Sequence, residues 1–191
     1  MLRGGLEVQM DVITDVRQTE TYRLRWKEHS WWALFYVDAA HGALSVQSDF
    51  GDFSYRWGSP GQPFKEFLVG LDDGYLKMKL SRGRDYFYSD ESLRRLRGAV
   101  DLKLKEDEST TAELRARCGE ALDELEECGD TDYAVFCHLI ADGPIGRLFE
   151  DYEELGGCLV RGFSPQLDQF VEKIWPEFVA VLRRELSASL A

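Results

Sequence analysis

The sequence lacks the marks of membrane-spanning and secreted proteins. No stretch approaches the roughly 18 consecutive apolar residues of a transmembrane helix, and the best apolar run, residues 31–37, has the length of a strand. The first five residues have no apolar core of the kind found in a signal peptide. The four cysteines are therefore expected to be buried thiols rather than a disulfide framework. We expect a soluble cytoplasmic protein that does not enter a membrane.

Sequence motifs of common enzyme classes are also missing. There is no phosphate-binding loop, no dinucleotide-binding glycine pattern and no nucleophile elbow. Residues 49–51 spell the metal-binding signature of protein kinases, but the other kinase motifs do not precede it, so we expect a hairpin turn there. None of the three histidines lies in a recognisable local triad. An enzyme with an unrecognised site stays open as an alternative, but no catalytic residue is predicted.

Metal binding is not indicated by the spacing of potential ligands. The four potential zinc ligands are the thiol or imidazole groups of Cys128, Cys137, His138 and Cys158. Paired ligands of zinc fingers and zinc ribbons stand two to four residues apart, and these do not follow that pattern. The sequence therefore predicts no metal and no cofactor.

What the chain has in quantity is apolar and acidic side chains. Hydrophobic residues make up 44% of the 191 residues and aromatic residues 13%, which is enough for a core and excludes a disordered chain. The length predicts a single domain over residues 1–191. Acidic residues number 35 against 23 basic ones, which gives a net charge of −12.

The first third of the chain has the pattern of an antiparallel β-meander. Apolar and polar residues alternate over residues 21–28 and 44–57, as in half-buried strands. With residues 31–38 and an earlier strand near residues 6–16, this predicts four or five strands within residues 1–58. The glycines and prolines of residues 58–63 end the meander.

The rest of the chain has helical periodicity. Residues 62–106 are expected to form helices that cover the sheet, and residues 109–191 an acidic helical subdomain. Thr110 and Glu113 have the spacing of a capping box at the start of one helix. The last helix begins at residues 164–165, with a kink or break expected at Pro176. The predicted fold class is α+β, with the helical two-thirds packed on one face of the sheet.

The negative charge is concentrated in one segment. Residues 119–156 hold twelve acidic side chains and one arginine, a net charge of −11, whereas the other 153 residues carry −1. Glu113, Glu120, Glu124 and Glu127 fall on one helical stripe, where carboxylates at i and i+4 are about 6 Å apart. That approximates the spacing of phosphates along a nucleic-acid strand. Such a surface can bind a basic groove made for nucleic acid; the alternative is a solubilising surface. The predicted partner-binding residues are Glu113, Glu120, Asp123, Glu124, Glu127, Glu150, Asp151, Glu153 and Glu154.

Residues 75–105 reverse the sign of the charge. They carry a net charge of +5, and their basic residues alternate with aromatic ones in a way that could hold a nucleic-acid strand. The candidate contacts are Lys77, Lys79, Arg82, Arg84 and Arg94. The overall charge of the protein opposes direct nucleic-acid binding at long range. An ordinary solvated helix face, or pairing with the acidic segment, is the alternative.

Residues 44–57 resemble a segment of a known group of proteins. Their Ser-Asp-Phe-Gly-Asp-Phe-Ser-Tyr-Arg-Trp segment is similar to a hairpin found in uncharacterised small proteins encoded by bacteriophages and prophages. Residues 64–80 and 176–186 look similar as well. The resemblance implies a phage accessory protein acting in the bacterial cytoplasm, and it carries no activity or site residue with it.

These patterns together favour a protein that acts by protein–protein interaction. The leading hypothesis is an inhibitor of a host defence or nucleic-acid-handling complex, of an anti-CRISPR-like kind, whose acidic surface mimics nucleic acid. The expected partner is a host protein complex with a basic nucleic-acid-binding surface. A phage nucleic-acid-binding protein using residues 77–97 is the alternative. One tryptophan of the Trp31–Trp32 pair must face away from the helices, so a homodimer that covers it is a further open expectation.

Overall fold

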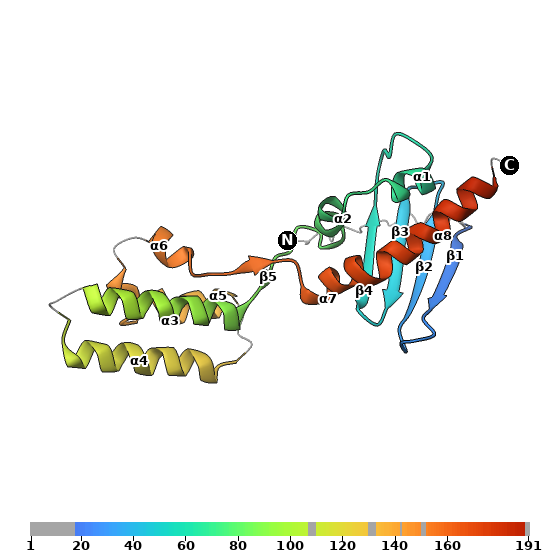
Figure 1. Cartoon of the computed structure of the whole chain (residues 1–191). Helices are drawn as coiled ribbons and strands as arrows, with labels where there is room; N and C mark the ends of the chain where they lie inside the picture. The colour runs from blue at the N-terminus through green and yellow to red at the C-terminus, as the bar shows by residue number, and fades with distance from the viewer. Residues whose placement is uncertain (1–17, 107–109, 130–132, 142, 150–151, 190–191) are drawn as a thin grey trace, which may run out of the picture. The chain divides into compact units, whose positions relative to one another are not determined.

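The computed structural model describes residues 18–106, 110–129, 133–141, 143–149 and 152–189. It confirms the α+β class: an N-terminal antiparallel sheet is followed by helices (Figure 1). The sheet consists of β1 (Glu20–Arg25), β2 (Trp32–Asp38), β3 (Ala43–Ser48) and β4 (Gly51–Arg56), in the order β1-β2-β3-β4. The further strand expected near residues 6–16 lies outside the described residues.

One face of this sheet is buried because apolar side chains alternate along its strands. Ala33, Phe35 and Val37 of β2 are buried, and their neighbours in β2 are more exposed on the other face, apart from Asp38. Across the buried face lies α8 (Trp175–Ala188) (Figure 1). The ring of Phe35 stacks on that of Phe178 of α8, with 3.9 Å between the ring centroids.

The hairpin turns have the geometry that their residues require. Residues 49–50 form the tight turn between β3 and β4, so the expectation of a hairpin at the kinase-like tripeptide is confirmed. Gly42, before β3, has a φ of +64°, and a Cβ there would lie 2.5 Å from the carbonyl oxygen of Trp57. The backbone N–H of Trp57 donates a hydrogen bond of 2.8 Å to the Gly42 carbonyl. Only glycine suits this close approach.

The C-terminal helix is interrupted before Pro176, as expected. It consists of α7 (Pro165–Gln169), the π-helical turn η2 (Phe170–Ile174) and α8. Proline has no N–H to donate and its ring clashes with the carbonyl four residues earlier, so a regular α-helix cannot run through this point. The N–H of Trp175 instead donates to the carbonyl of Phe170, five residues back.

The remaining helices form a separate core. After α1 (Phe64–Val69) and α2 (Asp73–Leu80) come α3 (Ser89–Glu106), α4 (Ala112–Glu127), α5 (Tyr133–Ala141), η1 (Gly146–Leu148) and α6 (Tyr152–Gly156). Two short strands, β5 (Tyr86–Phe87) and β6 (Arg161–Gly162), pair with each other. The buried cluster comprises Leu96, Val100, Leu104, Cys118, Leu122, Leu125, Phe136, Ile140, Ile145, Phe149, Leu155 and Cys158.

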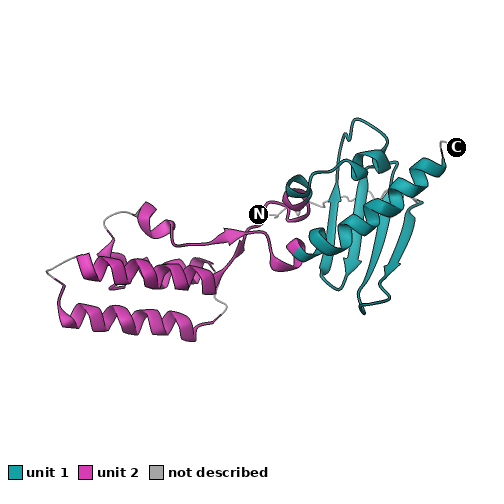
Figure 2. Ribbon diagram, in the orientation of Figure 1, with its two compact units in different colours: residues 1–76, 169–191 teal, residues 77–168 magenta. Residues whose placement is uncertain are grey.

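The chain groups into two compact units (Figure 2). Unit 1 contains residues 1–76 and 169–191, and unit 2 contains residues 77–168. The sheet with α1 and α8 belongs to unit 1, and the core of α3, α4 and α5 to unit 2. The single domain with segments 1–58, 62–106 and 109–191 stays a prediction; the unit boundaries fall at other positions.

The start of α4 corrects one local expectation. The N-cap is Thr111, whose hydroxyl oxygen accepts a hydrogen bond of 3.2 Å from the N–H of Leu114. The Thr110 hydroxyl is buried and has no hydrogen-bond partner among the residues described. Two adjacent threonines compete for the cap, and the one next to Ala112, the first helical residue, takes it.

Candidate functional site

The outer surface of α4 carries four carboxylates, with the exposed Arg117 between the first and the second. One side of α4 packs into the core of unit 2 through Cys118, Leu122 and Leu125. The helical period of 3.6 residues places four exposed glutamates on the opposite side. We call this set the acidic face of α4; its members are Glu113, Glu120, Glu124 and Glu127. None of the four forms an ion pair with any residue in the described part of the chain.

The position of these charges along the helix is costly at one end. Glu113 lies in the first turn of α4, where the helix dipole favours a negative charge. Glu124 and Glu127 lie in the last turns, and the last turn contains no basic residue. There the partial negative charge of the helix end repels carboxylates, typically by several tenths of a kcal/mol each. Glu120 and Glu124, four residues apart, also repel each other.

Other acids of this segment are held by cations of α3. Arg97 donates hydrogen bonds to the carboxylates of Asp123, at 3.0 Å, and Glu126, and to the carbonyl of Leu122. The carboxylates raise the pKa of the Arg97 guanidinium. Lys103 pairs with Glu154 of α6, with 2.8 Å between Nζ and Oε1. Pairing between the basic and acidic segments, one of the alternatives left open by the sequence, therefore occurs at these positions.

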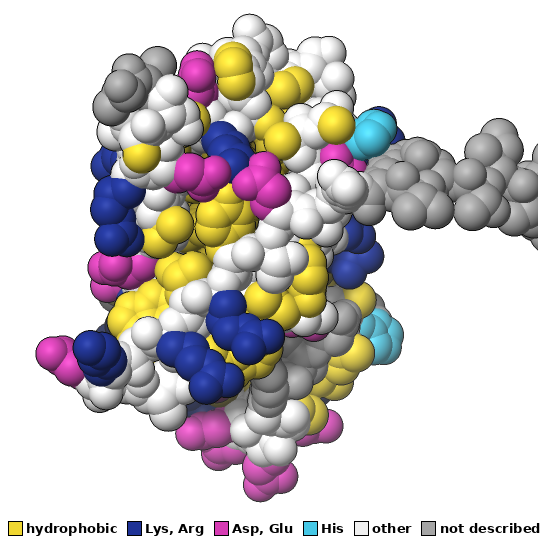
Figure 3. All heavy atoms as spheres, turned by 90° about the vertical axis from the view of Figure 1, so that its right-hand side faces the viewer, with side chains coloured by type: hydrophobic (Ala, Val, Ile, Leu, Met, Phe, Trp, Pro, Cys, Tyr) yellow, Lys and Arg dark blue, Asp and Glu magenta, His cyan; other side chains and the backbone are white. Residues whose placement is uncertain are grey.

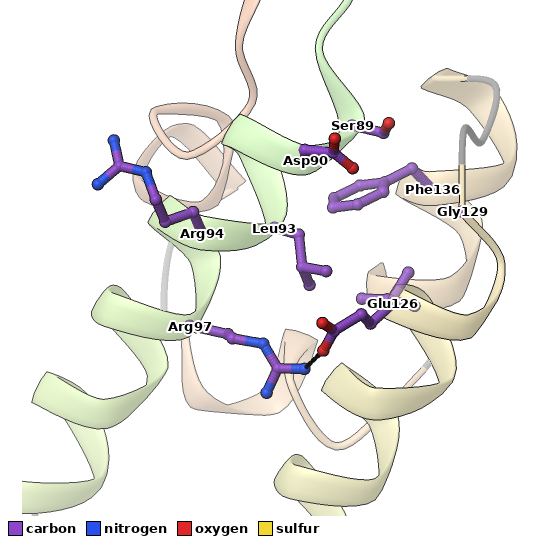
Figure 4. Close-up of a pocket in the computed structure, with 9 residues that line it drawn as sticks. Ser89, Asp90, Leu93, Arg94, Arg97, Glu126, Gly129 and Phe136 are labelled. Carbon is purple, nitrogen blue, oxygen red and sulfur yellow. Dashed lines mark hydrogen bonds and ion pairs between the residues drawn. The ribbon is translucent and has the colours of Figure 1, made fainter.

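A groove lies beside the Arg97–Glu126 ion pair (Figure 4). Its volume is about 300 Å³, and the apolar side chains of Leu93 and Phe136 lie next to the charged pair. The described lining residues include no histidine, cysteine or lysine. Among the described residues, the lining consists of Ser89, Asp90, Leu93, Arg94, Arg97, Leu125, Glu126, Gly129 and Phe136.

The nine predicted acidic residues thus separate into groups. Four form the acidic face of α4, and Asp123 and Glu154 are paired with cations. Glu153 is exposed and has an interaction partner. Glu150 and Asp151 lie outside the described residues. The sequence did not single out Arg97 or Lys103 as partners of these acids, because those contacts join positions 26 and 51 residues apart.

The predicted basic contacts are largely engaged with neighbouring groups. Lys77 pairs with Asp168 at 2.6 Å. Arg94 binds both carboxylate oxygens of Glu91 through its Nε and one terminal nitrogen. Lys79 and Arg82 each have an interaction partner, and Arg84 is exposed.

The contacts of Glu91 with two arginines lower the pKa of its carboxyl group. Hydrogen bonds from Arg94 and then Arg95 lower the pKa of the Glu91 carboxyl to about 2. A phosphate that approached Arg94 would therefore compete with a carboxylate that is already bound.

The cysteines and histidine considered as metal ligands are spread over different environments. Cys158 is buried, Cys137 is half-buried, and Cys128 and His138 are exposed, so the expectation of a buried thiol is wrong for Cys128. Burial raises the pKa of the Cys158 thiol, as it does for Cys118. Within the residues that the structure describes, no three histidine, cysteine or acidic side chains gather closely enough to hold a metal ion. No helix in the same part is both long and apolar enough to cross a membrane.

Comparison with known proteins decides the family. A family model described as a phage family, Phage_phiTE_072, matches residues 14–184. The chain belongs to this phage family. The phage association expected from residues 44–57 is therefore confirmed at the level of the family. No curated protein and no solved structure matches this phage protein.

Proposed function

We propose that this phage protein acts by binding a host protein through the acidic face of α4, rather than by catalysis. The observation that carries the proposal is that all four carboxylates of this face are exposed and unpaired among the described residues. Two of them lie near the end of the helix where the dipole disfavours them. A bound cationic surface would offset this repulsion, which otherwise only lowers the stability of the helix.

The partner class follows from the spacing of the charges. Glu120, Glu124 and Glu127 stand three or four residues apart, which places neighbouring carboxylates about 6 Å apart, close to the distance between phosphates on one nucleic-acid strand. Arginine and lysine side chains that hold phosphates can form the same charge-assisted hydrogen bonds with carboxylates. The proposed partner is therefore a host complex with a basic nucleic-acid-binding groove. Inhibition of a nucleic-acid-guided defence complex, an anti-CRISPR-type role, is the most specific version.

The experiment is a pull-down from bacterial lysate with the tagged full chain. The test variant carries Glu120→Lys, Glu124→Lys and Glu127→Lys. The control carries Asp52→Lys, Glu172→Lys and Glu177→Lys, three exposed acids of unit 1, so both variants change the net charge equally. We expect nucleic-acid-binding proteins to be retained by the wild type and the control, lost with the test variant, and released by excess DNA.

Two results would count against this function. If the test variant retains the same proteins in the same yield, the acidic face of α4 is a solubilising surface. If the retained proteins are not released by DNA, the mimicry of nucleic acid is wrong even though a partner binds. Circular dichroism of both variants establishes that the helices are intact, so that a loss of capture reports on the surface.

A further inference from the structure

The end of the hairpin formed by β1 and β2 contains a pocket rich in tryptophan. It belongs entirely to unit 1 and has a volume of about 340 Å³, within the range of small-ligand pockets. Three of the five tryptophans of the protein line it. Its lining residues are Arg25, Trp26, His29, Ser30, Trp31 and Trp32.

Two aromatic rings of this pocket, those of His29 and Trp31, are held by ring contacts. The imidazole of His29 stacks on the indole of Trp31, with 4.2 Å between centroids and 25° between planes. The edge of Phe50 meets Trp31 at 5.4 Å, and the ammonium of Lys173 lies 5.3 Å from the Trp31 ring. This arrangement leaves His29 exposed as the outer layer of the stack.

Trp32 offers a second open aromatic surface in the same pocket. Its side chain is 39% exposed, which is unusual for so large an apolar group. Its backbone N–H donates a hydrogen bond of 2.7 Å to the carboxylate of Asp49, which fixes the position of the backbone. An exposed indole on an ordered strand offers a stacking surface for a flat ligand.

The charges around the pocket are mainly positive. Arg25 is the cross-strand neighbour of Trp32, and residues 21–32 contain three basic residues, Arg23, Arg25 and Lys27, against Glu28. These three cations are exposed and form no ion pair with any described residue. On the face of the molecule drawn in Figure 3, Lys and Arg side chains lie beside hydrophobic and acidic side chains. An aromatic cage for a methylammonium group would be repelled by these cations, whereas a flat anionic ligand is attracted.

We propose that this pocket binds an unpaired base of single-stranded nucleic acid. The base stacks on Trp32 or on the outer face of His29, and the adjacent phosphates contact Arg25 and its basic neighbours. The proposal goes beyond the proposed function, because it assigns a second ligand to a different part of the chain. The attraction for phosphates rests on the cations beside the pocket alone, because unit 1 as a whole holds 14 acidic against 10 basic residues.

The test measures the fluorescence anisotropy of labelled dT and rU 20-mers with the full chain at low salt. We expect Trp32→Ala to weaken binding by roughly fivefold to 150-fold, the range for the loss of one stacked base. Arg25→Ala is expected to weaken binding and to lower its salt dependence, since it removes a phosphate contact. Two matched controls are expected to bind as the wild type does. Tyr75→Ala removes an equally exposed ring, and Arg183→Ala removes an exposed arginine of unit 1.

Four results would overturn the proposal. The first is no binding of either 20-mer at low salt, and the second is equal affinities of the wild type and both pocket variants. The third is binding of duplex DNA as tight as that of single strands. The fourth is a loss confined to Tyr75→Ala, which would favour the basic segment of residues 75–105. A decaproline peptide serves as the competing probe, because tryptophan-lined grooves also bind polyproline segments. Binding of that peptide through Trp32, without oligonucleotide binding, would assign the pocket to protein recognition instead.

Discussion

Lys65 of α1 connects three separate parts of unit 1. Its ammonium forms ion pairs with Glu20 of β1 and Glu185 of α8, and the hydroxyl of Tyr22 lies within hydrogen-bond distance of both carboxylates. Burial works against the charge on Lys65, but the hydrogen bonds with Glu185 and Glu20 raise its pKa. Hydrogen bonds from Lys65 and Tyr22 lower the pKa of the Glu185 carboxyl. The cluster is thus most stable when the lysine is protonated and the carboxylates are ionised.

Replacing Lys65 by methionine tests this cluster. We expect Lys65→Met to lower the free energy of unfolding at pH 7 by about 1 kcal/mol, because two neighbouring carboxylates lose their shared cation. Both carboxylates are more than a third exposed, so solvent screening limits the effect. Lys27→Met is the control, since Lys27 is exposed and unpaired among the described residues. Urea unfolding followed by circular dichroism measures both variants.

The same variant has a defined pH dependence. A carboxyl group with a lowered pKa in the folded state contributes stability above its ordinary pKa of 4.5 and loses that contribution as the pH falls. The difference between wild type and Lys65→Met should therefore be full near pH 7 and shrink below about pH 4.5. A difference that stays constant down to pH 3 would show that Lys65 acts through packing and not through charge.

At the level of single elements, the turn before β3 depends on one glycine. Gly42→Ala forces a left-handed backbone on alanine and places its Cβ against the carbonyl oxygen of Trp57. We expect a loss of about 2 kcal/mol or more, seen as a lower urea midpoint. Gly58→Ala is the matched control because nothing lies within 4 Å of its Cβ position. Equal midpoints for the two variants would contradict the steric argument.

The elements themselves were largely predictable, because they depend on local patterns. Alternation along residues 21–28 and 44–57 located strands, and Pro176 located the interruption of the last helix. Contacts over long sequence distance were not predictable. The pairing of Arg97 with Asp123 and the cluster of Lys65 with Glu185 depend on how helices pack, which no periodicity reveals. The choice of Thr111 over Thr110 depends on a shift of one residue, which is finer than a capping-box pattern resolves.

The candidate site was predictable only in outline. The stripe of Glu113, Glu120, Glu124 and Glu127 follows from helical spacing alone. The pocket at the end of the β1–β2 hairpin does not, because it needs a loop conformation that brings His29 onto Trp31. The two adjacent tryptophans were the available signal, since neighbouring strand residues face opposite sides of a sheet and cannot both enter one core.

For the whole molecule, the two cores should respond to mutation separately. Phe35→Ala removes a fully buried ring of unit 1 and Leu96→Ala a fully buried side chain of unit 2, each costing roughly 2 to 5 kcal/mol. Hydrogen exchange measured by mass spectrometry should then rise in β1–β4 and α8 for the first variant, and in α3–α5 for the second. A parallel rise in both sets of peptides would instead support the single domain expected from the length.

The ion pair between Lys77 and Asp168 joins the first and last residues of unit 2. The segments that lead into and out of the helices of unit 2 are joined a second time, because β5 pairs with β6. The hydroxyl of Tyr88 also donates a hydrogen bond to the carbonyl of Phe163. A segment whose two ends meet in this way can be exchanged for another without stretching the chain that flanks it. Unit 2 therefore has the geometry of an inserted segment: a chain without residues 77–168 would keep the sheet and α8, and its two flanking ends would already be close together.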